Sequence, residues 1–261
     1  MKSLNCLLAA LLAVAGLSGA AAAPVASPVA CTVIADLSTG SPILREGSCD
    51  QRFSPVSSFK LALAVMGYDS GILKGPHDPV WTLKPEFKAS KREQAYKEVD
   101  PALWEKDSIV WFSQQLTTRL GEARFAGYVK AFDYGNMDVS GDPGRGNGLT
   151  HEQVAFLHRL LTRELPVSDQ AVELTRATIA TYPAEGGWIV HGKSGSGWLE
   201  GDDGKPDRSK PQGWFIGWAE KGTRTVVFAR FIAAAKASDI PGGTKARESL
   251  IKDLPALMNG R

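Results

Sequence analysis

Residues 54–67 read Ser-Pro-Val-Ser-Ser-Phe-Lys-Leu-Ala-Leu-Ala-Val-Met-Gly. Pro55 has a fixed φ and no N–H group, so it suits the first position of a helix that Ser54 can cap. Over residues 59–66 every side chain except Lys60 is apolar. Because a helix without a polar face is normally buried, we expect this helix to run through the core of a domain.

The lysine in this apolar run is placed close to a serine. Lys60 follows Ser57 by three residues, which puts both side chains on the same face of a helix. Burial favours the neutral form of an amine, and a neutral amine beside a hydroxyl is a base beside a nucleophile. The alternative is a lysine whose charged end extends to the surface. The Ser-x-x-Lys spacing alone leaves both interpretations open.

The start of the chain has the pattern of a secretory signal peptide. Lys2 precedes an apolar run over residues 4–17, and small residues follow as far as Ala23. We predict a signal peptide over residues 1–22 and one mature domain over residues 23–261, located in the periplasm or secreted. No later run is long and apolar enough to span a membrane, so no stable membrane anchor is expected.

Export predicts an oxidising compartment, and this bears on the cysteines. Cys6 lies in the signal peptide, which leaves Cys31 and Cys49 as a pair. They flank two strand-like runs, so we predict a disulfide that closes a hairpin. The net charge of +2 gives no electrostatic case for binding nucleic acid. The chain is expected to act as a monomer or a homodimer.

The order of the remaining elements predicts the fold class. Strand-like runs lie at both ends of the chain, and helical runs lie between them and at the C-terminus. This order favours an α+β fold: an antiparallel β-sheet flanked by terminal helices, with an inserted helical lobe and the active site between them. The expected strands are 31–37, 42–46, 188–193, 213–219 and 223–232, and the expected helices are 101–119, 122–132, 150–165, a run from 168 and 243–258.

Four short segments occur in one order along the chain: Ser57-Ser58-Phe59-Lys60, Ser108-Ile109-Val110, Tyr134-Gly135-Asn136 and Lys193-Ser194-Gly195. Their order and spacing resemble those of the penicillin-recognising serine enzymes, and the particular residues in each segment resemble those of the class D β-lactamases. The likeness covers residues 31–257. It implies a β-lactamase/transpeptidase-like fold, a small-molecule β-lactam substrate, and hydrolysis through an acyl-enzyme on a serine.

The resemblance also implies a role for each matching residue. Ser57 would be the nucleophile, and Lys60 would take up CO2 as a carbamate and act as the general base, with no other cofactor. Ser108 would pass a proton toward the leaving nitrogen; from the residues alone, a buried serine bonded to a helix carbonyl is equally open.

Further residues would bind the substrate or shape the cleft. Lys193, Ser194 and Arg247 would bind the substrate carboxylate, and the backbone N–H groups of Ser57 and Ser196 would form an oxyanion hole. For Arg247, a solvated charge on a helix remains an open alternative. The expected cleft wall consists of Val110, Tyr134 and Asn136.

One departure from the class D pattern bears on turnover. In that class the loop after Tyr-Gly-Asn carries a tryptophan over the modified lysine, whereas residues 137–149 contain none. This departure predicts acylation more firmly than rapid deacylation. The alternative function as a β-lactam-acylated sensor or a slow-deacylating penicillin-binding protein therefore stays open. A third alternative is a peptidase that acts on cell-wall peptide, which the short inserted lobe and the class D motifs argue against.

Two other kinds of site are not expected. Residues 187–194 satisfy the phosphate-loop pattern G-x-x-x-x-G-K-[ST], but their bulky strand formers and the Gly-Ser-Gly that follows do not suit a loop leading into a helix. The four histidines lack the spacing of a catalytic zinc site, so no metal is predicted.

Overall fold

The computed structural model describes residues 29–137, 150–234 and 238–259. Its centre is a six-stranded sheet in the order β2-β1-β8-β7-β6-β5, in which every neighbouring pair is antiparallel. The strands are β1 (Val29–Asp36), β2 (Pro42–Gly47), β5 (Thr181–Ala184), β6 (Trp188–Glu200), β7 (Pro206–Lys221) and β8 (Arg224–Ala233).

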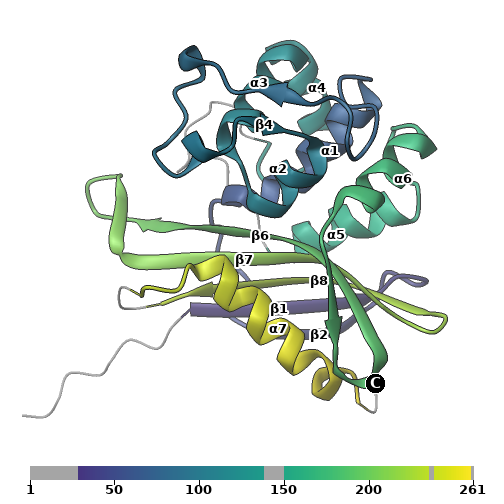
Figure 1. Cartoon of the computed structure of the whole chain (residues 1–261). Coiled ribbons are helices and arrows are strands. Elements are labelled where there is room, and N and C mark those ends of the chain that lie inside the picture. Colours follow the sequence, from purple (N-terminus) through teal and green to yellow (C-terminus); the bar gives the residue numbers. More distant parts are fainter. Residues whose placement is uncertain (1–28, 138–149, 235–237, 260–261) are drawn as a thin grey trace, which may run out of the picture.

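A helical lobe is inserted between β2 and β5 and lies over one face of the sheet (Figure 1). It confirms the predicted α+β architecture. Its helices are α1 (Lys60–Asp69), α2 (Pro101–Asp107), α3 (Val110–Leu120), α4 (Glu122–Ala131), α5 (Thr150–Leu161) and α6 (Asp169–Thr178). Short elements connect them: η1 (Val56–Phe59), β3 (Trp81–Thr82), η2 (Pro85–Phe87), η3 (Glu93–Ala95) and β4 (Glu98–Val99).

The other face of the sheet is covered by α7 (Gly242–Met258), the terminal helix among the described residues (Figure 1). Alternation along β7 separates the two layers of core. Trp214 and Ile216 belong to the large core beneath the lobe, whereas Phe215 belongs to the smaller core beneath α7. Each residue of β6 therefore faces either the lobe or α7, according to its partner on β7.

Helix α1 is the buried helix that the sequence predicts, since residues 60–68 are all buried. Its beginning differs from the prediction. A 3₁₀ turn, η1, precedes it, and Pro55 occupies the N-cap position without a side-chain cap. Ser54 is therefore not the cap; its carbonyl oxygen instead accepts a hydrogen bond of 2.8 Å from Trp214 Nε1 of the sheet.

The single helix predicted over residues 101–119 is two helices, which corrects that expectation. Asp100 caps α2, and its side chain accepts from the N–H of Leu103 at 2.7 Å. The break falls at Ser108, whose backbone is left-handed (φ 57°, ψ 47°). Glu93 accepts a hydrogen bond from the N–H of Val110 at the start of α3, so a residue distant in sequence makes the break possible.

The N-terminal hairpin and its disulfide are confirmed. Cys31 and Cys49 are bonded, with their Cα atoms 5.0 Å apart. The predicted signal peptide over residues 1–22 and most of the loop after Asn136 lie outside the described residues. None of the helices in the described ranges is long and apolar enough to cross a membrane.

Candidate active site

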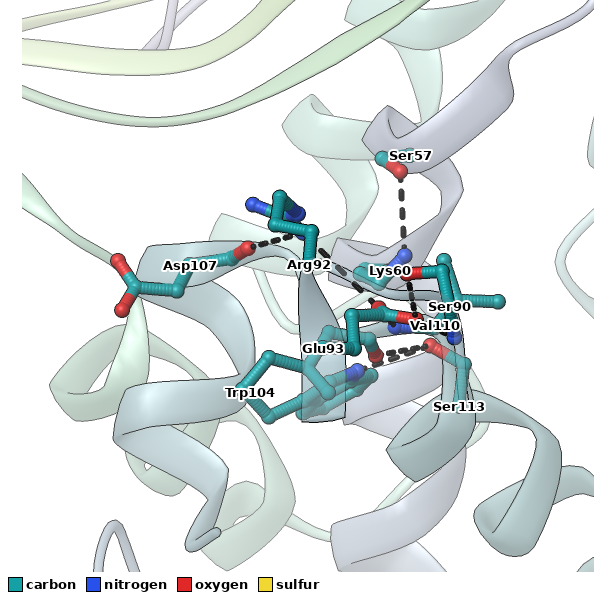
Figure 2. A network of polar contacts seen from close by, with 10 residues as sticks. Ser57, Lys60, Ser90, Arg92, Glu93, Trp104, Asp107, Val110 and Ser113 are labelled. Atoms are coloured by element: carbon teal, nitrogen blue, oxygen red, sulfur yellow. Dashed lines mark hydrogen bonds and ion pairs between the residues drawn. The ribbon is translucent and has the colours of Figure 1, made fainter. Parts of the chain in front are cut away.

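The nucleophile and base predicted from the sequence meet where η1 joins α1. Lys60 Nζ donates a hydrogen bond of 3.1 Å to Ser57 Oγ (Figure 2). The Lys60 side chain does not extend to the surface, since the residue is only 6% exposed. Burial, and secondly the positive charge of Lys193, lower the pKa of Lys60 from 10.5 to about 8. About one tenth of Lys60 is therefore neutral at pH 7 and about half at pH 8.

Strand β6 packs directly against the turn that carries Ser57. A Cβ atom at Gly195 would lie 2.7 Å from Ser58 N and 2.9 Å from the carbonyl oxygen of Pro55. Val56 has a positive φ of 44°, an unfavourable conformation for a β-branched residue that persists only where the surroundings impose it. The close approach of β6 thus fixes the backbone around Ser57.

The edge of β6 is open beside this turn. Strand β5 pairs with β6 only over Trp188–His191, and no other described strand pairs with that edge. The N–H of Gly192 points to this side, because it donates to the carbonyl oxygen of Ala180. Since backbone groups alternate along a strand, the N–H groups of Ser194 and Ser196 point to the same open edge.

Lys193 extends from β6 toward the lobe. It pairs with Ile216, whose side chain belongs to the core beneath the lobe. Lys193 is 3% exposed, and its Nζ donates to the carbonyl oxygen of Ser194 at 2.9 Å. Burial is the main cause that lowers the pKa of Lys193. The charge of Lys193 also acts on Lys60, which places the predicted carboxylate-binding lysine near the predicted base.

Helix α7 brings the predicted arginine to the other end of this region. The N–H of Gly243 donates to Ser196 Oγ at 2.9 Å and ties the start of α7 to β6. Arg247 follows about one turn later, with its guanidinium 5.1 Å from the centre of the Tyr182 ring and 3.8 Å from a carboxylate oxygen of Glu248. Burial is the largest cause that lowers the pKa of Lys193 and the charge of Arg247 lowers it further, whereas the charge of Glu105 raises it. The Arg247 side chain thus lies over the ring of Tyr182 on β5, at the edge of the sheet.

Ser108 lies at the break between α2 and α3. Its Oγ is buried and has no hydrogen-bond partner within the described parts of the chain, so the alternative of a bond to a helix carbonyl is not realised. Glu93 organises this break: it is 3% exposed and accepts from Val110 N and from Ser90 Oγ (Figure 2). The Val110 side chain is 44% exposed.

Tyr134-Gly135-Asn136 forms a turn, in which Gly135 has a φ of 60°. The Tyr134 ring is buried, packs edge-on against Phe59 with centroids 5.2 Å apart, and its hydroxyl donates to Gln153 Oε1 at 2.8 Å. Tyr134 therefore supports Phe59, the neighbour of Lys60, from behind, while Asn136 is exposed.

Sequence reasoning missed Glu105. This residue of α2 is 2% exposed, and neither carboxylate oxygen has a hydrogen-bond partner among the described residues. Burial raises its pKa to about 7, opposed by the charges of Lys193 and Lys60. A faint signal is its spacing of four from Pro101, which is also buried on α2.

The phosphate-loop pattern has no structural counterpart here. Residues 188–200 form one continuous strand, β6, so no loop leads from Lys193 into a helix. No group of three or more potential metal-binding side chains occurs in the described ranges.

Comparison with known proteins identifies the class of this fold and site. The model of the penicillin binding protein transpeptidase domain matches residues 30–162 and 158–256, so the chain belongs to this family. Beta-lactamase OXA-9 of Klebsiella pneumoniae is 55% identical over 243 residues, which are 88% of this chain and 89% of the relative. The crystal structure of the class D β-lactamase OXA-427 matches with a TM-score of 0.78 and 36% identity, covering 87% of this chain and 97% of that one. Within the family, the chain is a class D serine β-lactamase.

Two further matches define the breadth of the likeness. Beta-lactamase OXA-1 of Escherichia coli is 30% identical over 253 residues, 89% of this chain and 88% of the relative. The C-terminal domain of the Bacillus licheniformis BlaR penicillin-receptor has a TM-score of 0.71 at 23% identity, covering 84% and 87% of the two chains, which shows a shared fold.

Proposed function

We propose that this protein hydrolyses β-lactam antibiotics through an acyl-enzyme on Ser57. The observation that carries the proposal is the 3.1 Å hydrogen bond between Lys60 Nζ and Ser57 Oγ in a buried site. Ser57 Oγ attacks the lactam carbonyl carbon, its proton passes to the base at Lys60, and the C–N bond of the lactam breaks. Ser108 passes a proton to the leaving nitrogen. Attack by water then releases Ser57 and the opened product.

The general base is proposed to be a carbamate formed by CO2 on Lys60. Only a neutral amine reacts with CO2, and a pKa of about 8 supplies that form near neutral pH. The nearby Lys193 can balance a negative charge at this position. When bound, the group supplies an oxygen base first for Ser57 and later for the hydrolytic water.

Binding of the substrate is assigned to β6 and α7. Lys193, Ser194 and Arg247 are proposed to bind the β-lactam carboxylate, which suits the cationic character of this end of the site. The N–H groups of Ser57 and Ser196 are proposed as the oxyanion hole. Ser57 lies in the first turn of η1, where N–H groups have no partner within the helix, and the N–H of Ser196 points to the open edge of β6.

The context of the enzyme is part of the proposal. We assign residues 1–22 to a signal peptide and residues 23–261 to one exported domain in the periplasm or outside the cell. The mature protein is proposed to work without a membrane anchor or nucleic acid, as a monomer or a homodimer. The disulfide between Cys31 and Cys49 suits an oxidising compartment.

A β-lactam-acylated sensor or a slow-deacylating penicillin-binding protein is the second candidate. The observation in its favour is that residues 137–149 contain no tryptophan. A base without an apolar cover is wetter, and its carbamate is lost more readily. Acylation would then be followed by slow hydrolysis.

Nitrocefin hydrolysis with and without added bicarbonate distinguishes the candidates. The leading proposal predicts steady turnover that bicarbonate increases, and Lys60→Ala should remove both the turnover and the bicarbonate effect. A stoichiometric burst without a steady state, in the presence of bicarbonate, would favour the second candidate. Full activity of Lys60→Ala would overturn the role of Lys60.

A further inference from the structure

Glu105 is a buried carboxyl group that the reaction described above does not use. Its two oxygens lack hydrogen-bond partners among the described residues, although the residue is 2% exposed. An unpaired polar group of this kind is costly in a protein interior and calls for an explanation. The explanation offered by the structure is its charged surroundings.

Three titratable groups are buried together here: Lys60 on α1, Lys193 on β6 and Glu105 on α2. The charges of the two lysines act on Glu105, and its charge acts on both of them. Of the other groups that face the cluster, Arg92 acts on both lysines. Glu93 acts on Lys60, whereas Asp107 and Arg247 act on Lys193. The charge of Glu105 also acts on the Tyr68 hydroxyl of α1.

The charge on this cluster changes if CO2 adds to Lys60. Above pH 8, before addition, neutral Lys60 and anionic Glu105 sum to zero together with a cationic Lys193. Afterwards Lys60 carries one negative charge, which already balances Lys193. A second anion at Glu105 would then be an uncompensated buried charge, and a neighbouring like charge favours protonation of a carboxylate.

We propose that Glu105 takes up the proton released when CO2 adds to Lys60. The step forms a bond between Lys60 Nζ and the carbon of CO2, breaks one N–H bond, and places that proton on the Glu105 carboxylate. The charge of the cluster is zero before and after. This inference rests on the proposed carbamate on Lys60 and specifies what makes it stable in a buried site.

Glu93 provides a matched control, because it is also buried and also acts on the charge of Lys60. Its oxygens, however, accept from Ser90 Oγ at 3.0 Å, from Ser90 N at 3.4 Å and from Val110 N at 2.5 Å (Figure 2). Hydrogen bonds from several donors stabilise the carboxylate form. The oxygens of Glu93 are therefore already held by donors, unlike those of Glu105, and Glu93 serves as the control for the loss of a buried carboxylate near Lys60.

The test is the pH dependence of CO2 uptake, measured by the carbamate signal in ¹³C NMR with labelled bicarbonate and expressed per dissolved CO2. Above pH 8 the free Lys60 is mostly neutral. The wild-type affinity should then rise only about twofold from pH 8 to 9, as the last cationic Lys60 is deprotonated, because CO2 addition itself releases no net proton. In Glu105→Gln the proton goes to solvent, so the affinity should rise about tenfold over that unit. Glu93→Gln should keep the shallow wild-type profile.

Two outcomes overturn the inference, and they differ. Equal slopes in the wild type and Glu105→Gln, with the carbamate signal present in both, would refute the role of Glu105 alone. Absence of the carbamate signal from the wild type would refute it together with the proposed base. If Glu105→Gln does not fold, infrared spectra of the wild type decide the matter: CO2 loading at pH 8.5 should produce the carbonyl band of a protonated carboxylic acid, and its absence would contradict the proposal.

Discussion

Replacing Gly195 by alanine tests the contact between β6 and the turn that carries Ser57. A Cβ atom at this position would lie 2.7 Å from Ser58 N, 2.7 Å from Val56 Cγ2 and 2.9 Å from the Pro55 carbonyl oxygen. Two of these three atoms belong to the backbone, which cannot rotate away. The strand and the turn must therefore separate.

The size of the separation follows from the contact distances. Ordinary van der Waals contact begins at 3.4 Å, so the strand must move by about 0.7 Å. This movement takes the N–H of Ser196 away from Ser57, although both are proposed to bind the same developing oxyanion. A misplacement of about 1 Å can reduce a rate about 100-fold. We expect kcat/KM for a penicillin to fall about 100-fold, which corresponds to about 2.7 kcal/mol of transition-state stabilisation.

The assay compares kcat/KM and thermal unfolding for Gly195→Ala and Gly197→Ala. Gly197 lies on the same face of β6, but its Cβ atom would meet only side chains closely, with Val56 Cγ1 at 2.7 Å. A side chain can adjust, so Gly197→Ala should change kcat/KM only a few-fold. Wild-type kcat/KM in a folded Gly195→Ala variant would refute the argument that this approach fixes the site.

Three other changes are expected to have distinct effects. Lys60→Met should reduce β-lactam hydrolysis by at least about 100-fold, since it removes the base. It should also raise the free energy of unfolding at pH 7 by up to about 3 kcal/mol, because the lowered pKa means that burial of charged Lys60 opposes folding. In the wild type this cost diminishes as the pH rises from about 8 to 10.5. Unchanged stability in urea titrations would contradict this prediction. Ser108→Ala should lower kcat/KM about 100-fold with little change in the unfolding temperature, because Ser108 Oγ has no partner among the described residues to lose; a large fall in that temperature would indicate a structural role. Replacing Cys31 and Cys49 together by alanine should lower the free energy of unfolding by about 3 kcal/mol, from a sequence separation of 18 residues, and an unchanged urea midpoint would count against this.

The sequence predicted the parts of the fold that depend on local pattern. The unbroken apolar run after Ser58 identified the buried helix, and alternating or β-branched runs identified five of the six strands of the main sheet. Strand β5 was not predicted, since it is short and contains Pro183. Proline is tolerated there because β5 is an edge strand.

Features that depend on distant residues were not predictable in this way. The break at Ser108 depends on Glu93, which caps α3 from another segment. The true start of the Ser57 helix depends on Trp214, whose indole N–H binds the carbonyl oxygen of Ser54. Glu105 was missed for the same reason, since its burial becomes apparent only when α1, α2 and β6 come together.

The most direct test of the account is the intact mass of the protein after brief exposure to a penicillin. The central claim is that the buried Lys60 makes Ser57 a nucleophile, through the hydrogen bond of 3.1 Å between them. We predict that the wild-type protein gains the mass of one penicillin molecule, and that Ser57→Ala gains none. An adduct that persists in Ser57→Ala would contradict the account. So would a wild-type protein that gains no mass and leaves the penicillin intact.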